Sequence, residues 1–224
     1  IYQCDWSSDV CSSDLYLFRN LSRKIEKDEW DYVQTPLYEA LAVGACAGID
    51  VPEIGFGFGL LGRGLRYLAF AAFLRENRRG FKEYRQHLKS HDLPFDLDFE
   101  ERMWQCNNVQ VSAIILERMG FNRSIAIQYL AAAERSTNMP VDPLYGVRFR
   151  LAEAVIESYM EKQEIPQTAP AWVGADMSFP TELRAKLMTD LRRVISEKQR
   201  IEWLNKGASS ISPEQTPQIG RAHV

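Results

Sequence analysis

Residues 100–129 read EERMWQCNNVQVSAIILERMGFNRSIAIQY, and this stretch indicates the fold more firmly than any other. Its apolar residues recur at helical spacing, and they predict two short helices that end near Cys106 and at Gly120. A third helix is expected to begin after Asn122, whose side chain is a good N-cap. The stretch contains no histidine.

The remaining periodic stretches also have helical spacing, and no run alternates as a strand does. The sequence therefore predicts an all-α fold. One helix is expected to begin at Pro36, because proline suits the first helical position, and to end at Gly48. Further helices are expected at residues 59–75, 81–88, 144–162 and 181–205.

Both ends of the chain resemble translated sequencing adapters. Residues 4–15 read CDWSSDVCSSDL, and residues 219–224 read IGRAHV. Such segments are left out of fold reasoning, so we expect natural sequence over residues 16–218, as a fragment of a longer protein. We expect a non-native segment at residues 1–15 and an incomplete helical domain at 16–162. A linker at 163–180, an amphipathic helix at 181–206 and a disordered tail at 207–224 are expected to follow.

The interior of the chain is close to electrically neutral. The chain has 27 basic and 30 acidic residues, and removing one arginine and three aspartates with the ends leaves 26 and 27. This balance predicts neither a nucleic-acid nor a membrane partner. Cys46 and Cys106 lack CxxC spacing, which predicts a reducing, cytoplasmic location without structural zinc. Arg63 and Arg66 in the apolar stretch 54–74 predict a buried segment instead of a membrane span.

Two short motifs are compatible with binding sites but favour structural roles. Residues 57–62 satisfy GxGxxG, yet a Pro-bearing turn precedes them, so we expect glycines that let two helices pack closely. His87 and His91 are spaced i, i+4, which on a helix presents two metal ligands on one face, with Asp92 next. The nearby Pro94 instead predicts a solvated helix end. We therefore assign no catalytic, cofactor or metal residue.

Other polar and aromatic residues also favour structural roles. The carboxylate pairs Glu100/Glu101 and Glu153/Glu157 are predicted to lie on exposed helix faces. No GxSxG, Walker loop or Cys/His nucleophile spacing is present. Three aromatic residues without interleaved basic side chains are expected in the core or at its rim: Trp30, Trp104 and Tyr129.

Two segments follow consensus phrases of one helical family. Residues 55–66 parallel A-F-x-x-G-L-L-H-D-I-G-R, and residues 100–122 parallel E-x-x-x-x-G-x-x-H-A-x-V-G-A-x-L-L-x-x-W-G-F-P. On these phrases, residues 36–135 resemble an HDOD domain, the signalling-associated relative of the HD phosphohydrolases. The matching positions are Gly59, Leu60, Leu61, Arg66, Val111, Ser112, Ala113, Ile115, Leu116, Gly120 and Phe121.

The departures from the family fall on its polar positions. Gly62 and Arg63 replace the metal-binding His-Asp pair, and Asn108 stands at the later His position. A His-His pair that often ends the following helix falls at Ala132 and Ala133. The resemblance therefore implies an HD/HDOD-like helical bundle, truncated at its N-terminus, that keeps the packing frame without the metal chemistry.

Three functions remain as hypotheses. The resemblance implies a non-catalytic scaffold of bacterial signal transduction that binds a protein partner or self-associates, through a surface such as the apolar stripe over residues 183–204. An active HD metal-dependent phosphohydrolase is disfavoured, because the native histidines lie outside the family positions. An unrelated helical binder, of antitoxin, immunity or phage type, is favoured if Gly62, Arg63 and Asn108 lie far apart.

Overall fold

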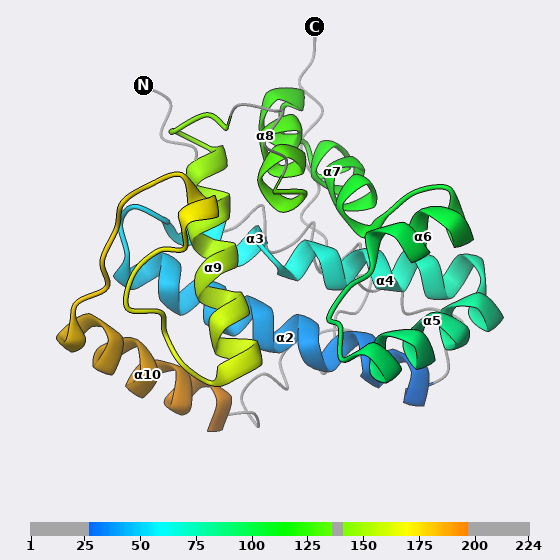
Figure 1. Cartoon of the computed structure of the whole chain (residues 1–224), viewed down its shortest axis with the longest axis horizontal. Helices are drawn as coiled ribbons and strands as arrows, with labels where there is room; N and C mark the ends of the chain where they lie inside the picture. The colour runs from blue at the N-terminus through cyan, green and yellow to red at the C-terminus, as the bar shows by residue number, and fades with distance from the viewer. Residues whose placement is uncertain (1–26, 136–140, 197–224) are drawn as a thin grey trace, which may run out of the picture.

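The computed structural model describes residues 27–135 and 141–196, and in these ranges every regular element is a helix apart from one isolated antiparallel bridge. The predicted all-α fold is therefore confirmed. The elements in Figure 1 are α2 (Lys27–Asp50), α3 (Phe56–Leu61), α4 (Gly64–Glu76), α5 (Arg78–His91), α6 (Leu97–Trp104), α7 (Asn108–Arg118), α8 (Arg123–Ala133), α9 (Gly146–Lys162), the 3-10 turn η1 (Ala171–Val173) and α10 (Thr181–Ser196).

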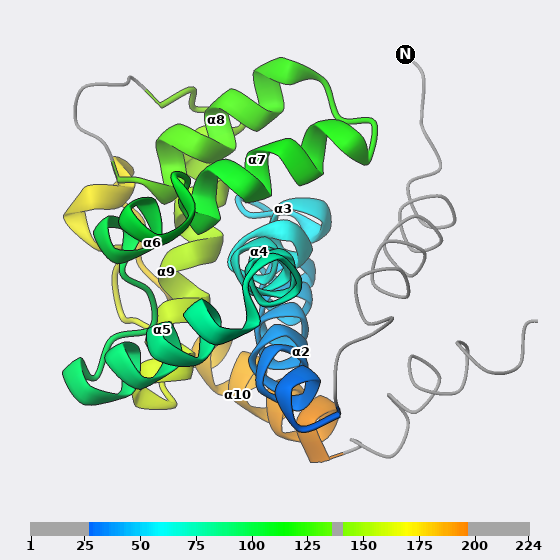
Figure 2. The same cartoon turned by 90° about the vertical axis from the view of Figure 1, so that its right-hand side faces the viewer.

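Helix α2 lies at the centre of the bundle. It contacts α3, α4, α9 and α10, while α7 packs on α4 and α8 joins α7 to α9. Figure 1 shows α9 crossing α2, with α10 along the lower edge, and Figure 2 shows α7 and α8 lying above α4. The buried apolar side chains of these helices form one continuous cluster. The core therefore lies between α2, α4 and α9.

Local capping sets the helix ends that the sequence predicts best. The Asn107 side chain accepts from Gln110 N at 2.9 Å in a capping box that opens α7. The Asn122 side chain accepts from Ile125 N at 2.9 Å and opens α8, as predicted. Between them Gly120 has φ 93°, a left-handed conformation that glycine adopts without strain.

The predicted limits of the first helix are wrong. Helix α2 begins by Lys27 and runs through Pro36 and Gly48 to Asp50. An interior proline costs about 3 kcal/mol because it lacks an N–H and its ring crowds the preceding turn. Apolar burial on both sides of Pro36, for example of Val33 and Leu37, outweighs this cost.

The stretch over residues 54–74 is mostly buried, as predicted, although Phe56 is exposed, and it forms two helices instead of one. The chain breaks at Gly62, where φ is −35° and ψ is −112°, and α4 follows after Arg63. None of the helices in the described ranges is both long and apolar enough to cross a membrane. The break matters because it aims Arg63 at α9.

One glycine of the GxGxxG motif, Gly59, lets two helices pack closely, as predicted. A Cβ atom on Gly44 of α2 would lie 1.9 Å from the carbonyl oxygen of Gly59 in α3, and one on Gly59 would lie 2.0 Å from the carbonyl oxygen of Gly44. No side chain fits at either position. The two backbones are therefore in direct contact.

The segment between α9 and α10 lies along the bundle and is attached to it. The guanidinium of Arg135 lies 4.0 Å from the ring centroid of Trp172, and Arg150 Nη1 of α9 donates to Trp172 O at 3.0 Å. Leu187 and Leu191 of α10 are fully buried and face α2. The described part of the predicted apolar stripe thus packs on the bundle. Its continuation, the polar tail and both adapter-like ends lie outside the described residues.

Candidate functional site

A pair of arginines meets a glutamate inside the bundle. Arg63 lies between α3 and α4, Arg66 lies one turn later, and Glu153 reaches them from the middle of α9. Their exposed fractions are 1%, 6% and 4%. The Glu153 Oε1 atom accepts from Arg63 Nη1 at 2.9 Å and from Arg66 Nη1 at 3.2 Å. Charged side chains this deeply buried are rare unless they are paired.

Arg66 is also linked, through Asn108, to a second buried carboxylate, that of Glu100. Arg66 Nε donates to Asn108 Oδ1 at 2.7 Å, and Asn108 Nδ2 donates to Glu100 Oε1 at 2.8 Å. Asn108 N also donates to Glu100 Oε2 at 2.5 Å, and the Tyr84 hydroxyl donates to Glu100 Oε1. We call this set of side chains the buried polar network: Arg63, Arg66, Tyr84, Glu100, Asn108 and Glu153.

An aromatic side chain covers the cationic part of the network. Phe95, in the loop before α6, places its ring centroid 3.7 Å from the Arg66 guanidinium carbon and 5.0 Å from that of Arg63. Tyr67 packs beside it, with the two ring centroids 5.2 Å apart. A desolvated guanidinium over a ring face gains cation–π energy. The cover therefore stabilises the charges that it removes from water.

The two glutamates have opposite pKa shifts. Burial acts to raise the pKa of Glu153, but Arg63 and Arg66 outweigh it, and the pKa lies below its usual value. For Glu100 burial prevails over the hydrogen bonds from Tyr84 and Asn108, so its pKa lies above the usual value. Glu153 is thus a stable anion in an ion pair, whereas Glu100 depends on neutral donors.

The network does not fit a divalent cation. Guanidinium groups remain protonated and offer no lone pair, and here two of them are bonded to Glu153. A metal ion would meet their positive charge at short range. Within residues 27–135 and 141–196, no three His, Cys, Asp or Glu side chains are gathered in a way that could hold a metal.

Several of the positions that the sequence analysis singled out lie in or beside this network. Arg63 and Asn108 belong to it, and the Tyr129 hydroxyl donates to Gly62 O at 3.4 Å. Ala132, near the end of α8, is buried in the same core. Gly62 and Arg63 are distant from Asn108 in sequence, and Arg66 connects them, because it shares Glu153 with Arg63 and donates to Asn108.

His87 and His91 do not form a metal site with Asp92. His87 Nε2 lies 2.7 Å from Asp96 Oδ2, and its ring stacks on Phe99 at a centroid distance of 4.5 Å. His91 is exposed at the end of α5, and Asp92 is the left-handed C-cap residue. The two histidine rings lie 4.3 Å apart, but the acid that meets His87 is Asp96 and not Asp92.

The predicted exposure of Glu100 and Glu153 is wrong. Both are buried, and both belong to the buried polar network. A signal was available for Glu153, since residues 149–156 are apolar on nearly every side of the helix and leave this charge little access to water. Glu100 gave no such signal, because the residues that follow it, Glu101 and Arg102, are charged.

Among the described residues, Cys46, Cys106, Trp30 and Trp104 have structural roles. Cys46 is buried and Cys106 is half-buried, and burial raises the pKa of both thiols, which makes them poor nucleophiles. Trp104 stacks on Phe73 at 4.4 Å, and Trp30 packs on the core, as predicted. None of these side chains offers chemistry beyond packing.

Comparisons of the chain with protein-family models, with curated proteins and with solved structures found no match.

Proposed function

We propose that the chain is a non-catalytic helical domain of HDOD type that acts in signalling through protein–protein interaction. The observation that carries the proposal is the buried polar network. It stands where the resemblance places the family's metal ligands, and arginine, glutamate and asparagine side chains there bond to one another. Although Arg63 Nε is buried without a partner, both glutamates of the network accept hydrogen bonds from protein donors, which leaves them poorly placed to bind a substrate.

The chemistry of these side chains supports a structural role. Metal-dependent hydrolysis needs a cation that lowers the pKa of a bound water, and the two guanidiniums disfavour a cation here. The network instead connects α4 to α7 and α9, which are separate in sequence. A buried ion pair adds little net stability but disfavours other packings, because it is costly to separate. A rigid bundle presents a fixed surface to a partner.

The alternatives receive less support. An active HD metal-dependent phosphohydrolase requires ligands where Gly62, Arg63 and Asn108 stand. An unrelated helical binder of antitoxin, immunity or phage type gives no reason for these three residues to gather around one buried network. Their proximity therefore favours the HDOD-type proposal.

The first experiment combines metal analysis with a hydrolysis assay on the purified chain. We expect less than stoichiometric zinc, manganese or iron by elemental analysis, and no cleavage of a nitrophenyl phosphodiester when each metal is added. The matched variant is Glu153→Gln, which removes the only network carboxylate that pairs with the arginines. A stoichiometric metal together with metal-dependent hydrolysis by the wild-type chain would refute the proposal, whether or not the variant loses them.

A further inference from the structure

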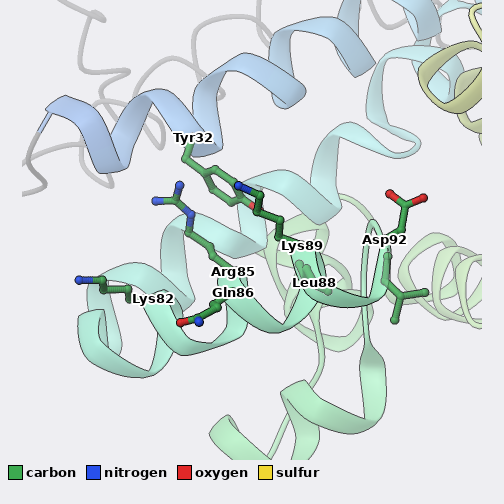
Figure 3. A pocket seen from close by; sticks show the side chains of 8 residues that line it. Tyr32, Lys82, Arg85, Gln86, Leu88, Lys89 and Asp92 are labelled. Atoms are coloured by element: carbon green, nitrogen blue, oxygen red, sulfur yellow. The ribbon is translucent and has the colours of Figure 1, made fainter.

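Helix α5 presents a row of cations beside an open groove. Lys82, Arg85 and Lys89 follow each other at i, i+3 and i+7, so they share one side of the helix. With Tyr32 of α2 and four more residues they line a cavity of about 510 Å³ (Figure 3). The other lining residues are Gln86, Leu88, Asp92 and Leu93.

The positive charge of this groove is not neutralised by the part of the chain that the structure describes. In residues 29–135 and 141–195, no carboxylate forms an ion pair with Lys82, Arg85 or Lys89. Neighbouring cations on α5 are paired: Arg78 Nε lies 2.6 Å from Glu29, and Arg79 pairs with Glu83. Asp92 is the one acid among the lining residues, and it stands at one end.

One cation of the groove is held in place. The Arg85 guanidinium carbon lies 3.6 Å from the ring centroid of Tyr32, and in Figure 3 both Arg85 and Lys89 extend toward that ring. Burial raises the pKa of Tyr32, although the neighbouring Arg85 acts to lower it. Leu88 is buried beneath the row. The groove therefore offers positioned donors over a firm apolar base.

The chemistry of the groove indicates an acidic segment of a protein. Lys82 and Lys89 are separated by about 10 Å along the helix. On one side of an extended strand, successive side chains lie about 7 Å apart, so two or three carboxylates span the row of cations. Leu93, 42% exposed, provides an apolar contact beyond the last cation. A nucleic acid is disfavoured, because Arg85 already covers the Tyr32 face on which a base would stack.

We propose that the groove between α2 and α5 docks an acidic, extended segment of a partner protein, with its carboxylates on Lys82, Arg85 and Lys89 and an apolar residue on Leu93. The inference rests on the proposed role in protein–protein interaction and assigns the partner's chemistry. Asp92 sets the direction of the segment, since it repels a carboxylate at that end.

Fluorescence anisotropy tests the docking on the full chain. The probe is a labelled peptide of three alternating glutamates followed by a leucine, and its control is the same peptide with glutamines. The variant Lys82→Gln/Lys89→Gln should weaken binding by about two- to thirtyfold, since each exposed charge pair contributes modestly. The control variant Arg118→Gln/Lys162→Gln removes the same charge from exposed positions outside the groove and should bind normally.

Three results would overturn the inference. They are no binding of the glutamate peptide at low salt, equal weakening by the two double variants, and displacement of the peptide by an equal concentration of inorganic pyrophosphate, which would assign a phosphate ligand. Each result leaves the metal and hydrolysis assays unchanged. Failure here is therefore distinguishable from failure of the proposed function, which would show as metal-dependent hydrolysis.

Discussion

At the scale of single residues, the buried carboxylate of Glu153 is the group whose removal should cost the most stability. Its carboxylate accepts from two buried arginines, and its own side chain is nearly inaccessible to water. Removing one partner of such a group leaves the other charges buried without compensation, which is far more costly than never having buried them. The other ion pairs of Arg63, with Glu157 and Glu161, are longer, and these carboxylates are more exposed.

Replacing Glu153 by glutamine should lower the free energy of unfolding by about 3–5 kcal/mol, because Arg63 and Arg66 lose their shared anion. Urea denaturation followed by circular dichroism measures this loss. The control is Glu161→Gln, whose carboxylate is 44% exposed and 3.8 Å from Arg63; we expect a change within about 0.5 kcal/mol. Equal effects of the two substitutions would contradict the importance of burial.

The pKa of Glu153 predicts the pH dependence of stability. Because the folded-state pKa lies below the ordinary value of 4.5, this carboxylate stabilises the fold above that pH and loses its contribution as pH falls below it. Unfolding of the wild type and of Glu153→Gln should therefore converge on acidification. The ionisation of Glu100 has the opposite effect on stability, because burial raises the pKa of this carboxylate. A gap between wild type and Glu153→Gln that stays constant below pH 4.5 would exclude this assignment.

At the level of helices, close contact between α2 and α3 depends on two glycines. Gly44→Ala should destabilise the fold by about 1–3 kcal/mol, as overpacking does, because the new methyl would lie 1.9 Å from Gly59 O. Replacing glycine by alanine also gains up to about 1 kcal/mol of helix propensity. The sign of the measured change in stability therefore shows whether overpacking or helix propensity is the larger effect. Thermal unfolding gives that sign. A more stable Gly44→Ala protein would show that the helices separate easily.

The docking of α10 rests on apolar burial. Leu187→Ala and Leu191→Ala should each cost about 2–5 kcal/mol, because both side chains are fully buried. The ion pair between Lys186 and Asp50 adds little, since the Lys186 side chain is 60% exposed. Limited proteolysis between α9 and α10 should become faster in the leucine variants and stay unchanged in Arg192→Ala, which alters an exposed residue of the same helix. Unchanged cleavage in all three would show that α10 docks by other contacts.

For the molecule as a whole, the continuous core predicts cooperative unfolding. Trp30, Trp104 and Trp172 lie in α2, α6 and η1, and all three pack against the same cluster. Tryptophan fluorescence and circular dichroism should therefore give coincident urea transitions. Separate transitions would indicate that the segment after α9 unfolds independently of the bundle.

Helix type and the better helix ends followed from neighbouring residues. Asn107 and Asn122 cap the helices that start beside them, and Gly120 ends another, because capping bonds span only a few positions. The apolar spacing likewise predicted an all-α fold. The resemblance to an HDOD domain drew attention to Arg63 and Asn108, although nothing in their spacing said what they bond.

The buried charges depended on tertiary contacts. Arg63 and Glu153 are 90 residues apart, and Arg66 and Asn108 are 42 apart, so no local window contains both partners. The sequence alone made Glu100 and Glu153 appear solvated, and it made Pro36 appear to start a helix. In both cases packing outweighed local preference: buried partners satisfied the charges, and apolar burial offset the hydrogen bond that proline lacks.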